Sequence, residues 1–168
     1  FVHAVRNNRC LLLSPTGSGK SFIIYLITRF YPQRKLIIVP TISLVHQLEK
    51  DFKDYSGQPG FRTLKISGDT NKDWVHRIDE DIVITTWQSI YKMPRDWFTQ
   101  FGVVIGDEAH QYKAKSLTSI LEKMPTCKYR FGFTGTLDGT ETHQLVLEGL
   151  FGKVKALVKT KELMEANQ

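Results

Sequence analysis

The amino-acid sequence predicts an α/β domain with a mostly parallel sheet flanked by helices. Short apolar runs alternate with longer amphipathic stretches along almost the whole chain, which is typical of parallel α/β sheets. Several runs are apolar in succession rather than in alternation, as Leu36–Val39 and Val103–Ile105 illustrate. Strands that are buried on both faces of a sheet have this character. In such sheets ligands bind beyond the carboxyl ends of the strands, so the residues that follow each strand are the first candidates for a site.

The apolar runs predict the strands one by one. Six strands are expected, over Arg9–Leu13, Lys35–Val39, Arg62–Ile66, Asp81–Thr85, Phe101–Ile105 and Tyr129–Thr134. Helices are expected between them, where apolar residues return with helical spacing. Helical patterns begin after Ser21 and cover Ser43–Asp54, Ser116–Met124 and Thr140–Leu150.

The composition fits one soluble domain. The chain has 168 residues, of which 41% are hydrophobic and 24% charged. No apolar run approaches the ~18–20 residues that span a membrane, and no signal peptide is visible, so we expect a cytoplasmic protein without a membrane partner. Cys10 and Cys127 are expected in the core of a protein from a reducing compartment. Because the chain does not begin with Met, we expect a piece of a longer protein, with one domain over residues 1–152 and a linker over 153–168.

A small-residue loop joins the first strand to the next helix. It reads Ser14-Pro15-Thr16-Gly17-Ser18-Gly19-Lys20-Ser21, which has the form of a Walker A phosphate-binding loop. Its glycines let backbone N–H groups turn inward, where they and the positive helix end attract phosphate. We expect residues 16–21 to bind the phosphates of ATP, with the Lys20 ammonium on the β- and γ-phosphates and the Ser21 hydroxyl on Mg²⁺. Ser14 stands where the motif usually begins with Gly, and an ordinary turn before a helix is the alternative.

Two adjacent carboxylates end the fifth strand. Asp107 and Glu108 follow the apolar run Val103–Ile105 and precede Ala109 and His110. Mg²⁺ prefers few carboxylates together with waters and phosphates, so Asp107 suits a metal site shared with Ser21. Glu108 can accept the proton of an attacking water as general base. An acidic helix N-terminus is the structural alternative, because carboxylates are favourable there.

Several segments resemble the motifs of superfamily 2 helicases and translocases, in the same order and spacing. Asp107–His110 has the sequence of their motif II, Phe133–Thr136 resembles motif III, and Pro40–Gln47 resembles motif Ia. Ile66–Gly68 and Thr85–Ser89 resemble the motifs after the third and fourth strands. The resemblance implies the first RecA-like P-loop NTPase domain of such an enzyme, in which motif III ends the strand between the two nucleotide strands.

The resemblance also implies roles for residues outside the phosphate loop. His110, Thr134 and Thr136 would connect the nucleotide state to domain movement. A second set would line the path of one DNA strand through contacts to its backbone: Pro40, Thr41, Gly68, Thr85 and Thr86. As structural alternatives, Thr41 caps a helix, and Thr85 and Thr86 end a strand. The aromatic side chains of Trp87, Trp97 and Phe98 are expected in the core rather than stacked on bases.

A narrower resemblance concerns the phage UvsW-type recombination helicases. It rests on Trp87-Gln88, Pro94–Gly102, Phe131–Leu137 and Gly149–Gly152. It implies action on single-stranded or branched DNA in recombination, replication or repair, in the host cytoplasm if a phage encodes the chain. The net charge of +6 is compatible with a nucleic-acid partner. The motor of a restriction-system translocase and an RNA helicase share these motifs, and a non-catalytic nucleic-acid-binding module is the alternative of another class.

The chain departs from the superfamily pattern in two respects. Gly106 stands before motif II, where an apolar residue is usual. Nothing in the sequence resembles the second RecA-like domain or its arginine finger, which contributes ~10³–10⁵ in rate in related hydrolases. We therefore expect the isolated chain to bind nucleotide weakly and to hydrolyse it poorly.

Overall fold

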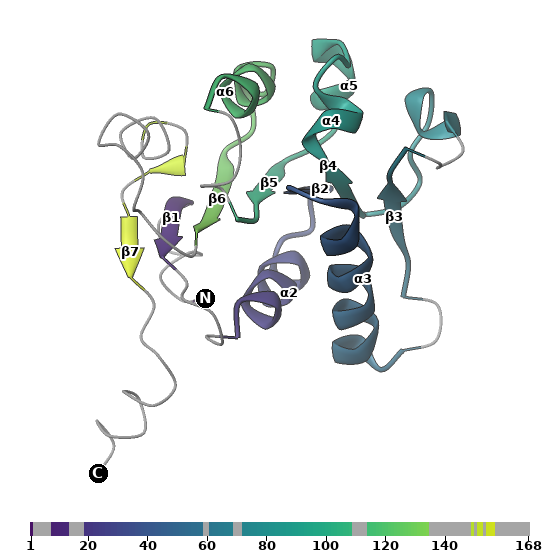
Figure 1. Cartoon of the computed structure of the whole chain (residues 1–168), viewed down its shortest axis with the longest axis vertical. Helices are drawn as coiled ribbons and strands as arrows, with labels where there is room; N and C mark the ends of the chain where they lie inside the picture. The colour runs from purple at the N-terminus through teal and green to yellow at the C-terminus, as the bar shows by residue number, and fades with distance from the viewer. Residues whose placement is uncertain are drawn as a thin grey trace.

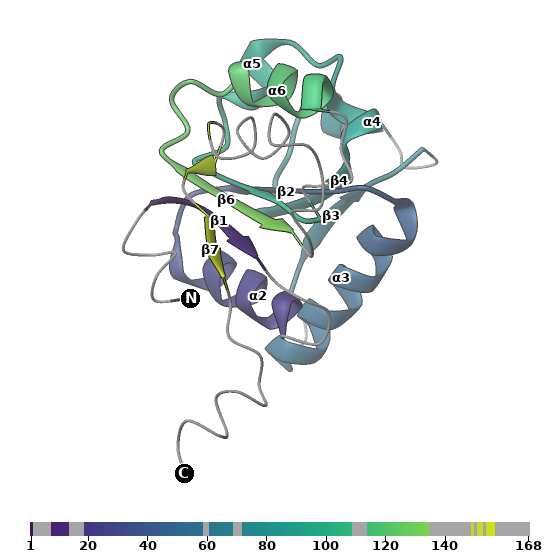
Figure 2. The same cartoon turned by 60° about the vertical axis from the view of Figure 1, so that its left-hand side comes forward.

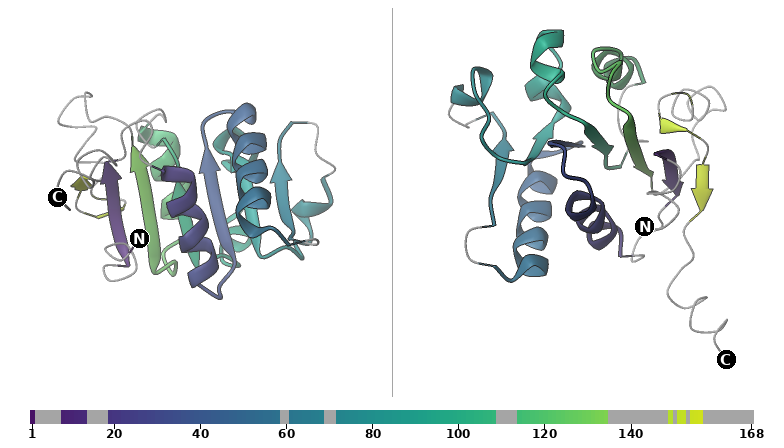
Figure 3. Two further views of the ribbon diagram at one scale, coloured as in Figure 1. Left: turned by 90° about the horizontal axis from the view of Figure 1, so that it is seen from below. Right: turned by 180° about the vertical axis from the view of Figure 1, so that it is seen from behind.

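A parallel sheet forms the centre of the domain. The computed structural model describes residues 1, 8–13, 19–58, 61–68, 72–108, 114–134, 149, 151–152 and 154–156. They form a seven-stranded sheet in the order β3-β4-β2-β5-β6-β1-β7, in which neighbouring strands run parallel. The left view of Figure 3 shows strands side by side and pointing in one direction. The predicted α/β fold with a parallel sheet is confirmed.

The elements follow the predicted order closely. The strands are β1 (Arg9–Leu13), β2 (Lys35–Val39), β3 (Thr63–Ile66), β4 (Ile82–Thr86), β5 (Val103–Gly106), β6 (Tyr129–Thr134) and β7 (Val154–Ala156). The helices are α2 (Lys20–Phe30), α3 (Ile42–Ser56), α4 (Trp87–Ile90), α5 (Arg95–Phe98) and α6 (Ala114–Glu122), together with the 3₁₀ helix η1 (Lys72–Val75). The short elements η1, α4 and α5 have no counterpart in the sequence prediction, because a single turn carries too few residues to show a period.

Strand β7 lies in the stretch that the sequence assigns to a linker. It pairs with β1, with Leu11 opposite Val154 and Leu13 opposite Ala156. The sheet therefore extends to Ala156, beyond the expected domain boundary. The helix expected over Thr140–Leu150 lies outside the described residues, apart from Gly149.

Helices cover both faces of the sheet. In Figures 1 and 2, α2 and α3 lie on one face, and α4, α5 and α6 lie on the other. Because neighbouring strand residues point to opposite faces, Leu36 and Ile38 of β2 pack in the core cluster that contains α5 and α6 side chains, whereas Ile37 and Val39 pack with α2 and α3. All four side chains are buried, which explains the continuously apolar run. Within the described residues, no helix combines the length and apolar character that a membrane crossing demands.

The core contains the aromatic and cysteine residues expected there. Trp97 and Phe98 are buried, and the partly buried Trp87 packs against the same cluster. The thiols of Cys10 and Cys127 are buried and free of disulfide bonds. The predicted core positions of these side chains are confirmed.

Local signals set the starts of the two long helices. Gly19 precedes α2 with φ 75°, a left-handed conformation that glycine adopts without a steric penalty. The Thr41 hydroxyl accepts a hydrogen bond from the Leu44 N–H at 3.3 Å and so caps α3. Both helices therefore begin at the carboxyl edge of the sheet, immediately after β1 and β2 and their connecting residues.

Phe151 fills a notch that two glycines leave between β5 and β6. Its ring is fully buried. A Cβ atom at Gly106 would lie 2.9 Å from the Phe151 Cζ, and one at Gly132 would lie 2.8 Å from its Cδ2. The two glycines are partners in the strand register, so their missing side chains open a single space. The unusual Gly106 before motif II is therefore explained by the packing of Phe151.

We expect Gly106→Ala to destabilise the domain, because the added methyl group meets a buried ring. Overpacking of this kind typically costs about 1–3 kcal/mol of unfolding free energy. Gly68→Ala is the matched control, since nothing lies within 4 Å of its added Cβ. Chemical denaturation measures both. Equal stabilities of the two variants would show that Phe151 does not occupy the notch.

Candidate nucleotide site and nucleic-acid groove

The candidate residues that the structure describes lie at one edge of the sheet, where the strands end. Strands β5, β6 and β1 are consecutive in the sheet, and they end at Asp107, Thr134 and the phosphate loop. Strands β3, β4 and β2 are also consecutive, and they end near Gly68, Thr86 and Pro40. The sheet order thus separates nucleotide candidates from nucleic-acid candidates, and the two groups meet between β5 and β2.

Lys20 reaches from the first turn of α2 to the carboxylates at the end of β5. Its ammonium lies 3.0 Å from Asp107 Oδ1 and donates a hydrogen bond to Glu108 Oε1. Lys20 and Glu108 are 88 positions apart in the sequence. The fold therefore joins the phosphate-loop lysine directly to both carboxylates of motif II.

The backbone at the end of β5 holds the two acids in place. The Asp107 N–H donates to the Ile38 carbonyl of β2 at 2.8 Å. Glu108 has φ 53°, which is uncommon for a residue other than glycine and costs of order 1–3 kcal/mol. Such strained residues cluster at functional sites. This sharp bend lets two consecutive side chains, which would point apart in a strand, both reach Lys20.

Burial and charge act in opposite directions on this cluster. Burial raises the pKa of Asp107 above its ordinary value and outweighs the attraction of Lys20. Burial would lower the pKa of Lys20, but the charges and hydrogen bonds of Asp107 and Glu108 together raise it. Burial determines the direction of the pKa shift for Asp107 but not for Lys20, because the Asp107 side chain is 6% exposed and that of Lys20 is 23% exposed. The ammonium is thus held charged, whereas the ionised Asp107 carboxylate is disfavoured.

Ser21 has a hydroxyl partner on the neighbouring helix. The distance from Ser21 Oγ to the Tyr55 hydroxyl is 2.7 Å. Tyr55 lies in the last turn of α3, and its ring contacts Phe22 edge-on with centroids 5.1 Å apart. The sequence carries no signal for Tyr55, because this contact depends on how α2 packs against α3.

Several predicted residues cannot be placed in the cluster. Five lie outside the described residues: Thr16, Gly17, Ser18, His110 and Thr136. Thr134 is described, and it is the fully buried last residue of β6. As the resemblance implies, β6 lies between β5 and β1, the two nucleotide strands.

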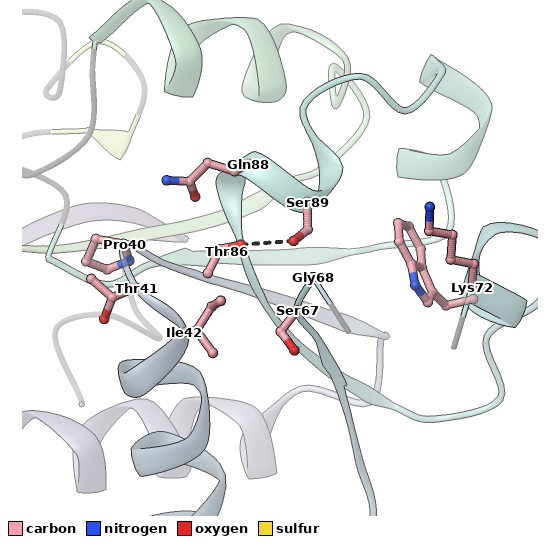
Figure 4. Close-up of a pocket in the computed structure, with 10 residues that line it drawn as sticks. Pro40, Thr41, Ile42, Ser67, Gly68, Lys72, Thr86, Gln88 and Ser89 are labelled. Carbon is pink, nitrogen blue, oxygen red and sulfur yellow. Dashed lines mark hydrogen bonds between the residues drawn. The ribbon is translucent and has the colours of Figure 1, made fainter. Parts of the chain in front are cut away.

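A groove of about 600 Å³ opens at the ends of β2, β3 and β4. Ten described residues line it: Pro40, Thr41, Ile42, Ser67, Gly68, Lys72, Trp74, Thr86, Gln88 and Ser89. Figure 4 shows Pro40, Thr41 and Ile42 at one end, Lys72 at the opposite end, and Ser67 and Gly68 between them. The hydroxyls of Thr86 and Ser89 lie 3.0 Å apart in a hydrogen bond (Figure 4). The groove therefore combines apolar surface with four hydroxyl groups and one amide.

Four of the five predicted nucleic-acid residues line this groove. Pro40, Thr41, Gly68 and Thr86 are brought together there from three strand ends. Thr85 is not part of the lining: its side chain is fully buried, and its hydroxyl donates to the Thr86 carbonyl at 2.9 Å. Thr85 therefore matches the structural alternative of a strand residue. Thr41 caps α3, and it also lines the groove.

The groove also contains residues that no site prediction named. Gln88 and Ser89 follow Thr86 directly, so their place in the same motif was a usable signal. Ile42 and Ser67 adjoin Thr41 and Gly68 in the same way. Lys72 and Trp74 of η1 had no such signal, because their position depends on where η1 packs.

Comparison with known proteins identifies the family. Residues 3–139 match the family described as "Type III restriction enzyme, res subunit". The chain belongs to this family.

Helicases are among its relatives. The chain is 37% identical over 166 residues to "ATP-dependent DNA helicase uvsW" of Enterobacteria phage T4, covering 96% of this chain and 33% of that protein. It is 26% identical over 147 residues to "Probable helicase D10" of Escherichia phage T5, covering 87% and 30%. The crystal structure of the UvsW helicase from Bacteriophage T4 matches with a TM-score of 0.81 and 37% identity, over 92% of this chain and 56% of that one. The chain spans about a third of the length of these curated relatives.

These matches confirm the superfamily prediction. The chain has the fold of the first RecA-like motor domain of superfamily 2 helicases, and it is similar to the UvsW type. Membership in this group implies the use of a nucleotide.

We expect Asp107→Asn to stabilise the domain at neutral pH. Because the pKa of Asp107 is raised, the folded state holds its proton more tightly than the unfolded state does. The ionised carboxylate therefore costs stability once the pH rises above the ordinary value of 3.8, and Asn removes that cost. Thermal unfolding should show the advantage of the variant growing above that pH and then levelling off.

Asp54→Asn, which alters an exposed carboxylate on α3, is the control and should show no such trend. An advantage of Asp107→Asn that shrinks as the pH rises would contradict the expectation.

Proposed function

We propose that the chain is the ATP-hydrolysing motor domain of a DNA helicase. The observation that carries the proposal is the contact of Lys20 with Asp107 and Glu108, beside a groove at the same sheet edge. A phosphate-binding cation, a metal-binding acid and a general base are the groups that phosphoryl transfer to water requires. A groove that offers hydroxyl groups and an amide beside apolar surface suits a strand whose backbone is bound without reading its sequence.

The residues present fit a nucleotide and Mg²⁺. Ser21 and Asp107 supply a hydroxyl and a carboxylate oxygen, and Mg²⁺ prefers such hard ligands in small number. Ser21 follows Lys20 in the first turn of α2, and the Asp107 carboxylate is 3.0 Å from the Lys20 ammonium. In this proposal Ser21 and Asp107 hold the ion, which when bound neutralises charge on the phosphates. Residues 16–21 surround the phosphates.

Lys20 and Glu108 have complementary tasks. The Lys20 ammonium exchanges its carboxylate partners for the β- and γ-phosphate oxygens of ATP. That exchange frees Glu108 to accept a proton from the attacking water at a carboxylate oxygen. The Glu108 side chain is 19% exposed, so water can reach it, whereas the more deeply buried Asp107 is less suited to this task.

We further propose that the groove carries one DNA strand and that a second RecA-like domain completes the motor. Opening and closing of two domains would convert hydrolysis into movement, with His110, Thr134 and Thr136 as the coupling residues. Similarity to the phage T4 DNA helicase supports DNA as the substrate. Branched DNA as the preferred form and the host cytoplasm as the place of action are proposed from the resemblance of the sequence motifs to the UvsW-type helicases. The same similarity favours a helicase over a restriction-system translocase or an RNA helicase, and the joined Lys20, Asp107 and Glu108 argue against a non-catalytic module.

We expect Lys20→Ala and Glu108→Gln each to abolish most of the ATPase activity of a longer protein that includes a second motor domain. Loss of a general base typically lowers the rate about 10²–10⁴-fold. Glu122→Gln, at the exposed end of α6, makes the same chemical change away from the site and should keep full activity. Steady-state phosphate release with and without DNA measures the rates, and equal activity in all three variants would refute the catalytic assignment.

The 168-residue chain alone provides a separate test. We expect it to hydrolyse ATP poorly, because the transition-state arginine is expected from another domain. Strong DNA-stimulated hydrolysis by this chain would refute the need for a second domain.

We expect Gln88→Ala to weaken binding of single-stranded DNA by about three- to tenfold, because its exposed amide lines the groove. Gln47→Ala is the control: this amide is exposed on α3, outside the groove, where it donates to Asp51. Fluorescence anisotropy of a labelled oligothymidine measures both affinities. Equal affinities for the two variants would indicate that the strand does not follow this groove.

A further inference from the structure

The 3₁₀ helix η1 contributes a cation to one end of the groove. Lys72 is its first residue, and the side chain is exposed on the groove opposite Pro40 and Thr41 (Figure 4). It follows β3 by a few residues and lies outside every motif that the superfamily resemblance covers. The position of Lys72 is therefore a property of the fold rather than of a recognised motif.

Buried contacts of the same short helix hold it in place. Trp74 is 8% exposed and packs edge-on against Trp97 of α5, with ring centroids 5.6 Å apart. The Trp97 indole N–H donates to the Trp74 carbonyl at 3.2 Å. Because both the ring and the backbone of Trp74 are anchored, η1 presents Lys72 from a fixed backbone.

The charge of Lys72 stands out among its neighbours. It is the one charged side chain among the ten described residues that line the groove. No ion pair joins its ammonium to a carboxylate in the part of the chain that the structure describes. By contrast, Lys20, Lys35, Lys53 and Lys65 each have an acidic partner. An ammonium at the end of a groove whose other described lining residues are uncharged provides a point charge for an anion.

We propose that Lys72 binds a backbone phosphate of the nucleic-acid strand that occupies the groove, and so extends the strand path onto η1. This inference rests on the proposed function of the groove. Lysine suits this task because its compact charge binds a phosphate without reading the base. At the opposite end, Thr41 and Ile42 at the start of α3 line the same groove. The strand is then held at both ends, with the hydroxyls and amide of Thr86, Gln88 and Ser89 between them.

The consequence is measurable as salt dependence. Each phosphate neutralised on a single strand contributes about −0.7 to the slope of log affinity against log salt. Lys72→Ala should therefore reduce the steepness of that slope by about 0.7 and lower the affinity for a labelled oligothymidine several-fold at low salt. Lys72→Arg keeps the charge and should keep both quantities.

Lys50→Ala is the matched control. Lys50 is exposed in the middle of α3, outside the groove, so its removal changes the net charge by the same amount. We expect its affinity and slope to equal those of the parent protein. Equal effects of Lys72→Ala and Lys50→Ala would overturn the proposal, because only net charge would then matter.

The outcome also separates this inference from the proposed function. If Gln88→Ala weakens binding and Lys72→Ala does not, the groove carries the strand but the path does not reach η1, and the inference fails alone. If neither variant weakens binding, the groove itself is not the path. Displacement of the oligothymidine by a poly-glutamate peptide at equal charge concentration would point to an acidic protein partner and would likewise overturn the proposal.

Discussion

The pairing of β2 with β5 is the contact on which both functional regions depend. It lies at the centre of the sheet and joins the strands of the nucleotide residues to those of the groove. The register places Ile38 opposite Gly106, and the N–H of the next residue, Asp107, donates to the Ile38 carbonyl. Leaving such a buried group unpaired costs about 1–3 kcal/mol. Motif II therefore cannot slide along the sheet without displacing β2, which continues through Val39 and Pro40 into the groove.

The cluster at the end of β5 favours chemistry over stability. Asp107 is buried with a raised pKa, and Glu108 has a strained backbone conformation. Each feature disfavours the folded state, and neither is needed to build the sheet. The apolar side chains buried on both faces of the sheet supply the stability that keeps these groups in position. Functional sites commonly contain such unfavourable features, and the rest of the fold compensates for their cost in stability.

The sequence predicts where the strands end better than it predicts which side chains at a strand end face the surface. Lys20 and the two acids were predictable because each directly follows a strongly apolar strand, and parallel strands bring their ends to one edge. The same reasoning named Pro40, Thr41, Gly68 and Thr86, which the fold gathers at the groove. Thr85 was named with them, but it lies outside the lining because β4 is buried along its whole length.

Other features were beyond prediction for physical reasons. Strand β7 has only three residues, too few to show a pattern, and its place is fixed by pairing with β1. Tyr55 and Lys72 reach their sites through the packing of one helix on another, which no local pattern records. Long, strongly periodic segments can be predicted from the sequence, whereas single helical turns and helix-to-helix contacts become visible only in the folded structure.

The notch filled by Phe151 limits which residues can be exchanged between this chain and its relatives. Positions 106 and 151 share one volume, and here the strand position is empty and the later position is large. A chimera that imported a bulky residue at 106 from another superfamily member would also have to import a smaller partner at 151. The two positions are 45 residues apart in the sequence. Their side-chain sizes should vary together among related chains, so that a large residue before motif II is accompanied by a small one at the position of Phe151.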